Sequence, residues 1–145
     1  MPELSIQKIN TQHPLYPAVF LLREEVLRKP LGLSLYHEDT SADDQDDILV
    51  ALIDQQVIAC LMLHYIDQQT VKFRQMAVAE AYRSKHIGQQ LIRFAEAVLT
   101  DAGYKKIQLH ARMSALGFYE KLAYQAYGAE FEEVTIPHIA MQKLL

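Results

Sequence analysis

The sequence predicts a mixed α/β (α+β) fold in which most strands are antiparallel and one helix makes a parallel crossover. The expected elements follow the order β-α-β-β-β-α-β-α-β-β along the chain. Three consecutive strands are joined by the short polar connections 54–56 and 67–69, which is typical of antiparallel hairpins. The strand after the long amphipathic helix can run parallel to the strand before it, because a crossover helix carries the chain back along the sheet.

The first third of the chain is predicted to form a strand, a helix and a long loop. Residues 4–9 alternate well enough for an opening strand, and apolar residues recur at helical spacing over residues 16–27. Pro30 and Gly32 end this helix. Residues 33–47 show no clear periodicity, and loops of such length in compact domains are often functional.

The remaining two thirds alternate strands and helices. Strands are predicted over residues 48–53, 57–65 and 71–78, a helix from about Ile87 to a stop at Gly103, a strand over 106–110, a helix over 113–122, and strands over 124–131 and 136–143. The apolar stripe of the long helix, expected to face the core, is Ile87, Leu91, Phe94, Ala95, Val98 and Ala102.

Length and composition limit the organisation and the class of protein. The 145 residues are predicted to form one domain, 1–145, with half of the residues apolar. The net charge of −4 argues against nonspecific binding to nucleic acid, which depends on Lys and Arg that neutralise phosphates. The beginning of the chain does not resemble a signal peptide, and no stretch is apolar enough for a membrane span, so we expect a cytoplasmic protein without a membrane partner.

The single cysteine and the acidic residues each admit a structural interpretation. Cys60 has no second thiol as a partner, and its apolar neighbours predict an inert strand residue rather than a nucleophile. Six acidic residues gather near the long loop: Glu38, Asp39, Asp43, Asp44, Asp46 and Asp47. Such a run is more typical of a solvated loop than of a site that receives a cationic amine, although it lies where an amine could enter.

The segment 71–99, VKFRQMAVAEAYRSKHIGQQLIRFAEAVL, contains a strand, the loop 79–86 and the start of a helix. The first N–H groups of a helix have no partner within it and lie at the positive end of its dipole, so this junction can hold a pyrophosphate. Gly88 lets a ligand approach the backbone closely. The backbone donors of Ser84 and His86 can still serve where φ stays negative, so we expect binding to survive the loss of glycine at these positions.

This segment resembles motif A of the GNAT superfamily, the acyl-CoA-dependent N-acetyltransferases, whose pattern is Arg/Gln-x-x-Gly-x-Gly/Ala after a strand. Arg83 and Gly88 match the two ends of the pattern, and His86 stands in place of the middle glycine. The resemblance implies a splayed, mostly antiparallel sheet of about seven strands between helical layers (αβα). It also implies an acetyl-CoA site formed by Met76, Ala77, Val78, Arg83, Ser84, Lys85, His86, Ile87, Gly88, Gln89 and Phe118.

A second resemblance lies in the segment 109–124, LHARMSALGFYEKLAY. It is similar to the later GNAT motif, in which an alanine precedes Phe-Tyr-x-Lys-x-Gly-Phe on a short helix. The resemblance implies that Tyr119 is the general acid that protonates the departing thiolate. Without the motif, Tyr119 would be read as a half-buried helix residue beside Phe118. Arg112 occupies the place where the family often has asparagine.

The general base is not visible in the sequence. Some GNAT members carry a glutamate on the strand before motif A, but Arg74 and Gln75 stand at the corresponding place. The remaining candidates are a chain of water molecules, His64, His110 and Glu24. His110 lies on the face of its strand opposite Leu109, so it either projects into the cleft or makes an ordinary hydrogen bond.

Both ends of the chain resemble the ElaA/YjcF-like branch of the superfamily. The segments 22–27, LREEVL, and 136–141, IPHIAM, are similar to the "REEVF" helix and the "GIPH" strand entry of that branch. In this fold the first helix and its loop usually form a wall of the acceptor site. The resemblance thus adds Arg23, Glu24 and His138 to His64 and His110 as residues that could face the substrate, although charged residues on an amphipathic helix are most often surface residues.

The combined expectation is an N-acetyltransferase that moves an acetyl group from acetyl-CoA to a primary amine by direct attack. A small-molecule amine or aminosugar is favoured as acceptor over a protein. The alternatives are a catalytically weak or inactive CoA-binding module and a protein lysine or N-terminal acetyltransferase. The six histidines show no metal-ligand spacing, so no metal is expected. A homodimer is common for the fold.

Overall fold

The computed structural model describes residues 3–145, and residues 1 and 2 of the expected domain lie outside the described part. It contains one seven-stranded sheet in the order β1-β2-β3-β4-β5-β7-β6. The strands are β1 (Ser5–Ile9), β2 (Asp47–Ile53), β3 (Gln56–Tyr65), β4 (Thr70–Val78), β5 (Lys106–Arg112), β6 (Gln125–Glu133) and β7 (Ile136–Leu144). Every neighbouring pair is antiparallel except β4 and β5. The predicted fold class is confirmed.

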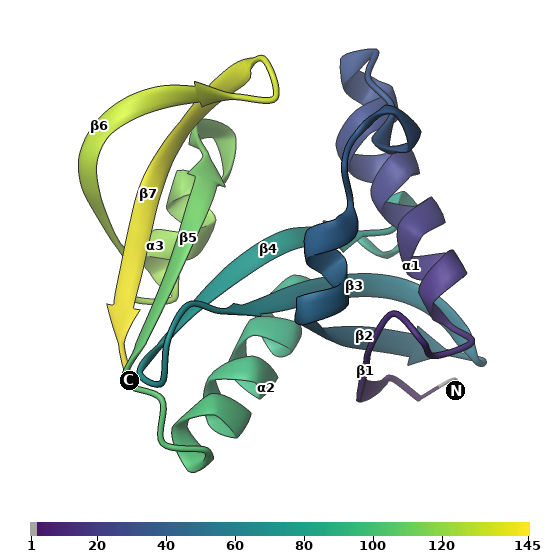
Figure 1. The fold of residues 1–145 in the computed structure, drawn as a ribbon, viewed down its shortest axis with the longest axis horizontal. Helices are drawn as coiled ribbons and strands as arrows, with labels where there is room; N and C mark the ends of the chain where they lie inside the picture. Colours follow the sequence, from purple (N-terminus) through teal and green to yellow (C-terminus); the bar gives the residue numbers. More distant parts are fainter. Residues whose placement is uncertain (1–2) are drawn as a thin grey trace.

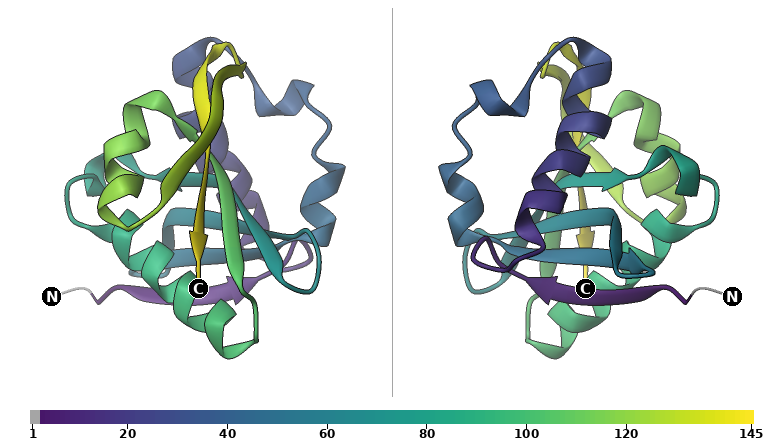
Figure 2. Two further views of the ribbon diagram at one scale, coloured as in Figure 1. Left: turned by 90° about the vertical axis from the view of Figure 1, so that its left-hand side faces the viewer. Right: turned by 90° about the vertical axis from the view of Figure 1, so that its right-hand side faces the viewer.

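Helices cover both faces of the sheet (Figures 1 and 2). The helix α1 (Tyr16–Arg23) packs on one face, where Val19 joins a buried cluster formed by side chains of β2, β3 and β4. The helix α2 (Ile87–Asp101) and the short helix α3 (Leu116–Lys121) pack on the other face, where the larger cluster lies. In residues 3–145 no helix combines the length and the apolar character that crossing a membrane requires.

Two predicted helices differ in detail from the structure. The first does not stay α-helical to residue 27 but continues from α1 as a π-helical turn, Glu24–Arg28, followed by a 3-10 turn. On α2 the buried residues are Ile87, Leu91, Ile92, Ala95 and Leu99. The expected stripe was therefore wrong at Phe94, which is 37% exposed, and at the exposed Ala102. Successive residues lie about 100° apart around a helix. The residues that are buried on α2 therefore define a face centred about 40° from the predicted one.

The strands β4 and β5 pair over a short length and then separate. Their parallel register runs from Thr70 opposite Lys106 to Phe73 opposite Leu109 and ends there. Figure 1 shows the two strands side by side near the C-terminus and diverging toward the opposite end. Beyond Phe73 the edge of β4 that faces β5 has no strand partner, so its backbone groups are free to bind an extended ligand.

A β-bulge in β4 coincides with this separation. Cys60 pairs with Ala77 but Met62 pairs with Arg74, so β4 has one more residue than β3 in this interval. The extra residue is accommodated by Gln75, whose φ of 53° is left-handed. The bulge shifts the alternation of side chains, so that Met76 now packs with Phe73 on the α2 face.

Candidate active site

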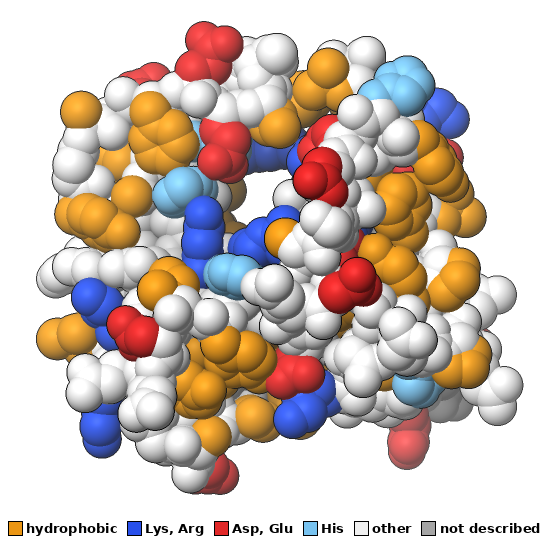
Figure 3. All heavy atoms as spheres, in the orientation of Figure 1, with side chains coloured by type: hydrophobic (Ala, Val, Ile, Leu, Met, Phe, Trp, Pro, Cys, Tyr) orange, Lys and Arg blue, Asp and Glu red, His pale blue; other side chains and the backbone are white. Residues whose placement is uncertain are grey.

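A cavity of about 800 Å³ opens where β4 and β5 separate. It is bounded by β4, β5, the π-helical turn after α1, α3 and the turn between β6 and β7. Figure 3 shows basic and histidine side chains gathered around this hollow, between the β5–β7 part of the sheet and α1, with acidic side chains on its rim. The ionisable residues that line it are Arg28, Glu38, Lys72, Arg74, Arg83, His110, Arg112, Tyr119, Glu133 and His138.

Tyr119 lies in the wall of this cavity. Its ring is buried and packs edge-to-face against Phe118 and Tyr124, with centroid distances of 5.0 Å and 5.8 Å. Within residues 3–145, no protein group forms a hydrogen bond with its hydroxyl, and the hydroxyl oxygen is not fully enclosed by protein atoms. Burial raises the pKa of Tyr119 to about 12, so the phenol carries its proton at neutral pH. The structure thus holds a protonated phenol without a protein partner in the cavity.

The loop before α2 presents a row of unpaired backbone donors. Among the described residues, no protein acceptor is found for the N–H groups of residues 84–89. Ser84 and His86 have φ values of 63° and 60°, so the condition of negative φ at these two positions is not met. The left-handed conformation is the one that glycine adopts most readily, and for other residues it costs about 1–2 kcal/mol each. Left-handed residues in such a loop turn successive N–H groups toward one concave surface that suits an anion.

Several of the other residues expected at the cofactor site lie close to one another or line the cavity. Met76 and Arg83 line the cavity itself. A Cβ atom on Gly88 would lie 3.5 Å from Phe118 Cζ, 3.6 Å from Met76 Cε and 3.8 Å from Val78 Cγ2. Gly88 is therefore close to all three side chains. Ala77, in contrast, is buried on the α1 face and can offer only its backbone to a ligand.

Five residues were expected to face the acceptor, and two of them, His110 and His138, line the cavity. His110 Nδ1 lies 3.0 Å from Glu133 Oε1, and His138 Nε2 lies 3.7 Å from the other oxygen of the same carboxylate. His138 is buried and its Nδ1 is 2.9 Å from Ile136 O. The carboxylate of Glu133, which the sequence did not single out, is therefore hydrogen-bonded to His110 and lies near His138. Nothing in the sequence indicates that Glu133, the last residue of β6, meets His110, because β7 lies between β6 and β5 in the sheet.

The other three candidates make contacts within the protein outside this cavity. Arg23 is buried and its Nη1 lies 2.7 Å from Asp43 Oδ2, so the expectation that it is a surface residue was wrong. Glu24 accepts hydrogen bonds from Ser34 Oγ at 2.7 Å and from the Leu35 N–H at 3.0 Å. These two bonds lower the pKa of Glu24, which makes it a weaker base. His64 Nδ1 is 2.7 Å from Asp46 Oδ1.

Two residues of the acidic run are buried rather than solvated. Asp43 is 1% exposed and Asp46 is 3% exposed, so the solvated-loop interpretation was wrong for this pair. Arg23 pairs with Asp43, and Arg74 Nη1 lies 2.6 Å from Asp46 Oδ2. Arg23 Nε also donates to Gln75 Oε1 at 3.4 Å. These two buried carboxylates therefore pair with Arg23 and with Arg74, which lines the cavity, and they are not open to an incoming amine.

Cys60 is enclosed in the sheet, as its apolar neighbours predict. It is fully buried, and burial raises the pKa of its thiol to about 12. A thiol in this state is a poor nucleophile.

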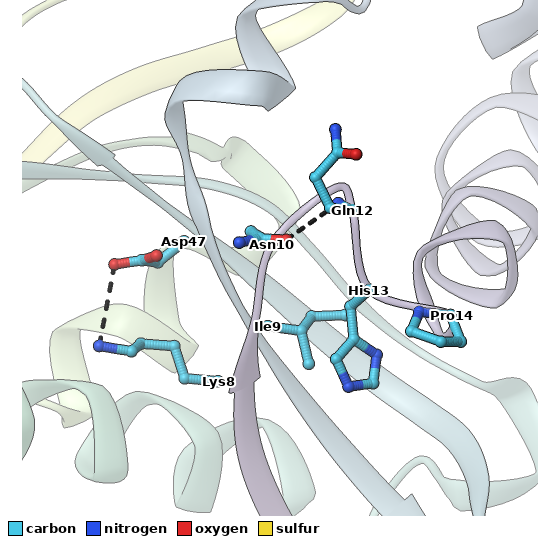
Figure 4. A pocket seen from close by; sticks show the side chains of 7 residues that line it. All are labelled: Lys8, Ile9, Asn10, Gln12, His13, Pro14 and Asp47. Carbon is cyan, nitrogen blue, oxygen red and sulfur yellow. Dashed lines mark hydrogen bonds and ion pairs between the residues drawn. The ribbon is translucent and has the colours of Figure 1, made fainter.

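A second hollow, of about 390 Å³, lies where β1 ends (Figure 4). The polar ends of Lys8, Gln12 and His13 point in different directions there. Lys8 Nζ is 4.0 Å from Asp47 Oδ2, and Gln12 N–H donates to Asn10 Oδ1 at 2.9 Å. These side chains do not converge on a common point, so this hollow lacks the features of a binding site.

Comparison with known proteins assigns the family. The family model described as "Acetyltransferase (GNAT) family" matches residues 13–124. The chain belongs to the GNAT acetyltransferase family. The enzyme class expected from the sequence, an acyl-CoA-dependent N-acetyltransferase, is confirmed with it.

Two curated relatives come from Bacillus subtilis (strain 168). The uncharacterized protein YyaT is 25% identical, with 97% of this chain and 95% of the relative covered. The uncharacterized N-acetyltransferase YjcF is 25% identical, with 86% of this chain and 89% of the relative covered. The similarity to YjcF agrees with the branch that both chain ends indicate.

Solved structures share the fold over nearly the whole chain. An acyl-CoA N-acyltransferase from Pseudomonas aeruginosa has a TM-score of 0.84 at 24% identity, covering 97% of this chain and 99% of that one. Escherichia coli ElaA has a TM-score of 0.83 at 21% identity, with coverage of 97% and 99%. A GNAT family acetyltransferase from Elizabethkingia anophelis, solved with acetyl-CoA bound, has a TM-score of 0.71 at 18% identity, with 98% of each chain covered.

Proposed function

We propose that this chain transfers the acetyl group of acetyl-CoA to the primary amine of a small molecule by direct attack. The observation that carries the proposal is the split between β4 and β5, which joins the unpaired N–H groups of the loop before α2 to a cavity that contains the free hydroxyl of Tyr119. One extended ligand with a diphosphate at one end and a thioester at the other would satisfy both features. Holding thioester and amine together could contribute about 7 kcal/mol or more to the barrier reduction in good cases.

The cofactor would be held mainly by backbone groups. Its diphosphate would accept hydrogen bonds from N–H groups of residues 84–89 at the positive end of α2. Its amide-containing arm would lie along the unpaired edge of β4 at Met76 and Val78. Acetyl-CoA supplies the activated acyl group, and an N–H group of β4 polarises the thioester carbonyl.

The diphosphate site can be tested by a single added charge. Gln89 lies in the first turn of α2, and its side-chain oxygen, in the orientation that satisfies its neighbours, accepts hydrogen bonds from Arg93 Nε at 3.2 Å and Nη2 at 3.3 Å. Gln89→Glu keeps the shape, adds a negative charge at the positive end of the helix and pairs it with Arg93, so the free energy of unfolding should rise by about 0.3–1 kcal/mol. The same charge should repel the diphosphate and raise the Kd of acetyl-CoA at least about tenfold.

Calorimetric titration with acetyl-CoA and urea unfolding measure the two effects separately. The control is Gln68→Glu in the exposed turn between β3 and β4, which changes the net charge equally and should leave the Kd unchanged. An unchanged Kd in Gln89→Glu would contradict a diphosphate at this helix. A wild-type chain without measurable affinity for acetyl-CoA would contradict the proposed function as a whole.

His110 and Glu133 are proposed as the general base. Of the candidate side chains, His110 lines the cavity, whereas Glu24 and His64 do not. Glu133 faces His110 Nδ1, so an N–H at Nδ1 would donate to the carboxylate and leave Nε2 free to accept a proton. The attacking amine would lose its proton to Nε2, and Tyr119 would give its proton to the sulfur.

His110→Gln should lower kcat about 100-fold, which is within the range for loss of a general base. The Kd of acetyl-CoA should stay unchanged, because His110 lies on the α1 face of β5. Steady-state rates with a turned-over amine measure kcat, and His64→Gln serves as the histidine control outside the cavity. Equal rates in His110→Gln and the wild type would exclude His110 as the base.

A further inference from the structure

Two arginine side chains meet in the cavity at one backbone oxygen. Arg28 Nη1 and Arg112 Nη2 each donate a hydrogen bond to Leu27 O at 3.2 Å. Arg28 belongs to the π-helical turn after α1, whereas Arg112 is the last residue of β5. The two guanidinium groups therefore lie side by side, although their residues come from opposite sides of the split.

The charges at this point are not balanced. Arg28 is paired with Glu38, which accepts from Arg28 Nε at 2.5 Å and from Nη2 at 3.1 Å. Within residues 3–145, no carboxylate forms an ion pair with Arg112, and the side chain's one hydrogen bond is to Leu27 O. Partial burial and the positive charge of Arg28 both lower the pKa of Arg112. Two positive charges thus share one negative charge, and an anion bound beside Arg112 would offset the repulsion between them.

The position of this pair separates it from the expected cofactor diphosphate. His110 and Arg112 alternate on β5 with Leu109 and Ala111, which belong to the core on the α2 face. Their side chains are therefore directed to the α1 face, whereas the unpaired N–H groups of the loop 84–89 belong to α2 on the other face. The Cα atoms of His110 and Arg112, two residues apart on one strand, are separated by about 7 Å.

We propose that Arg112, supported by Arg28, binds the carboxylate of an acceptor that is an amino acid. This inference rests on the proposed acetyl transfer and specifies its acceptor. A guanidinium forms two parallel hydrogen bonds with a carboxylate, and one carboxylate supplies the single negative charge that the pair lacks. With the carboxylate on Arg112, the amine of an α-amino acid or a short ω-amino acid extends along β5 toward His110.

The test compares matched amines as acceptors. Release of CoA thiol from acetyl-CoA is measured for the twenty standard amino acids and for β-alanine and 4-aminobutyrate. Each is compared with its amide, with its decarboxylated amine and with the aminoalkylphosphonate analogue where one exists. For at least one amino acid, kcat/KM in the wild type should exceed that of the amide and of the decarboxylated amine at least tenfold.

In Arg112→Gln, kcat/KM for the amino acid should exceed that for its amide by no more than about threefold, mainly because the KM for the amino acid rises. The Kd of acetyl-CoA should stay unchanged. Arg112→Lys, which keeps the charge but loses the paired donors, should restore part of the preference. The control is Lys105→Gln, an exposed residue before β5, which removes the same charge and should leave the preference intact.

The outcomes distinguish this inference from the proposed acetyl transfer. If amines that lack a carboxylate are acetylated and the matching amino acids show no higher kcat/KM, the acceptor assignment is overturned. The proposed acetyl transfer then still stands. A higher kcat/KM for phosphonates than for carboxylates would mean that the arginine pair binds a phosphate group and would overturn the carboxylate assignment. A loss of acetyl-CoA affinity in Arg112→Gln would mean that this arginine binds the cofactor and would likewise overturn it. Binding of acetyl-CoA without turnover of any compound contradicts both proposals and favours a CoA-binding module.

Discussion

Tyr119→Phe is expected to lower kcat at least about 100-fold while the protein stays folded and binds acetyl-CoA as before. The hydroxyl of Tyr119 makes no hydrogen bond to the described protein groups, so its removal leaves no protein donor or acceptor unpaired. The free energy of unfolding should therefore change by less than about 0.5 kcal/mol. If the phenol protonates the leaving thiolate, kcat falls while the Kd of acetyl-CoA stays unchanged. Rates of thiol release and calorimetric titration measure these two quantities.

Tyr124→Phe is the matched control for this substitution. Its ring lies 5.8 Å from that of Tyr119, but its hydroxyl donates to Glu96 Oε2 at 2.8 Å. Removing this hydroxyl should cost about 1 kcal/mol of stability and leave kcat unchanged. The two variants are thus expected to show opposite effects on rate and stability. A Tyr119→Phe protein with the wild-type rate would exclude Tyr119 as the acid.

Asp43→Ala is expected to destabilise the protein by about 3–5 kcal/mol, because it leaves the buried guanidinium of Arg23 without its counterion. Asp43 Oδ2 also accepts from the Tyr16 hydroxyl at 2.7 Å. The same carboxylate connects the acidic loop, α1 and, through Arg23 and Gln75, the bulge of β4. Urea unfolding followed by circular dichroism measures the change.

The control is the neighbouring acidic residue, Asp44→Ala. Asp44 is exposed and accepts one hydrogen bond from Thr11 Oγ1 at 2.7 Å. Its removal should cost less than about 1 kcal/mol. Equal stability losses in Asp43→Ala and Asp44→Ala would contradict a structural role for the buried ion pair.

The sequence predicted the order of elements and the junction between β4 and α2 correctly, because both depend on local patterns. Apolar periodicity located the strands and helices, and the motif at residues 109–124 singled out Tyr119, which lies in the wall of the cavity at the split. The resemblance to a known family added the splayed sheet, which periodicity does not encode. The TM-score of 0.83 with ElaA supports that part of the prediction.

The errors concern properties that depend on contacts between distant segments. Asp43 and Asp44 are indistinguishable in the sequence, and the buried one is the residue that meets Arg23 and Tyr16, which are distant in the sequence. Ser84 and His86 adopt a conformation typical of glycine because the loop between β4 and α2 imposes it. The pairing of Arg112 with Arg28 at Leu27 O joins residues more than eighty positions apart, and nothing local predicts it.

A crystal structure of the chain with CoA bound would test the proposed cofactor site. We expect diphosphate oxygens within hydrogen-bond distance of the N–H groups of residues 84–89, the arm of the cofactor along β4, and the thiol within reach of the Tyr119 hydroxyl. A cofactor bound elsewhere, or a thiol directed away from the split between β4 and β5, would contradict this proposal.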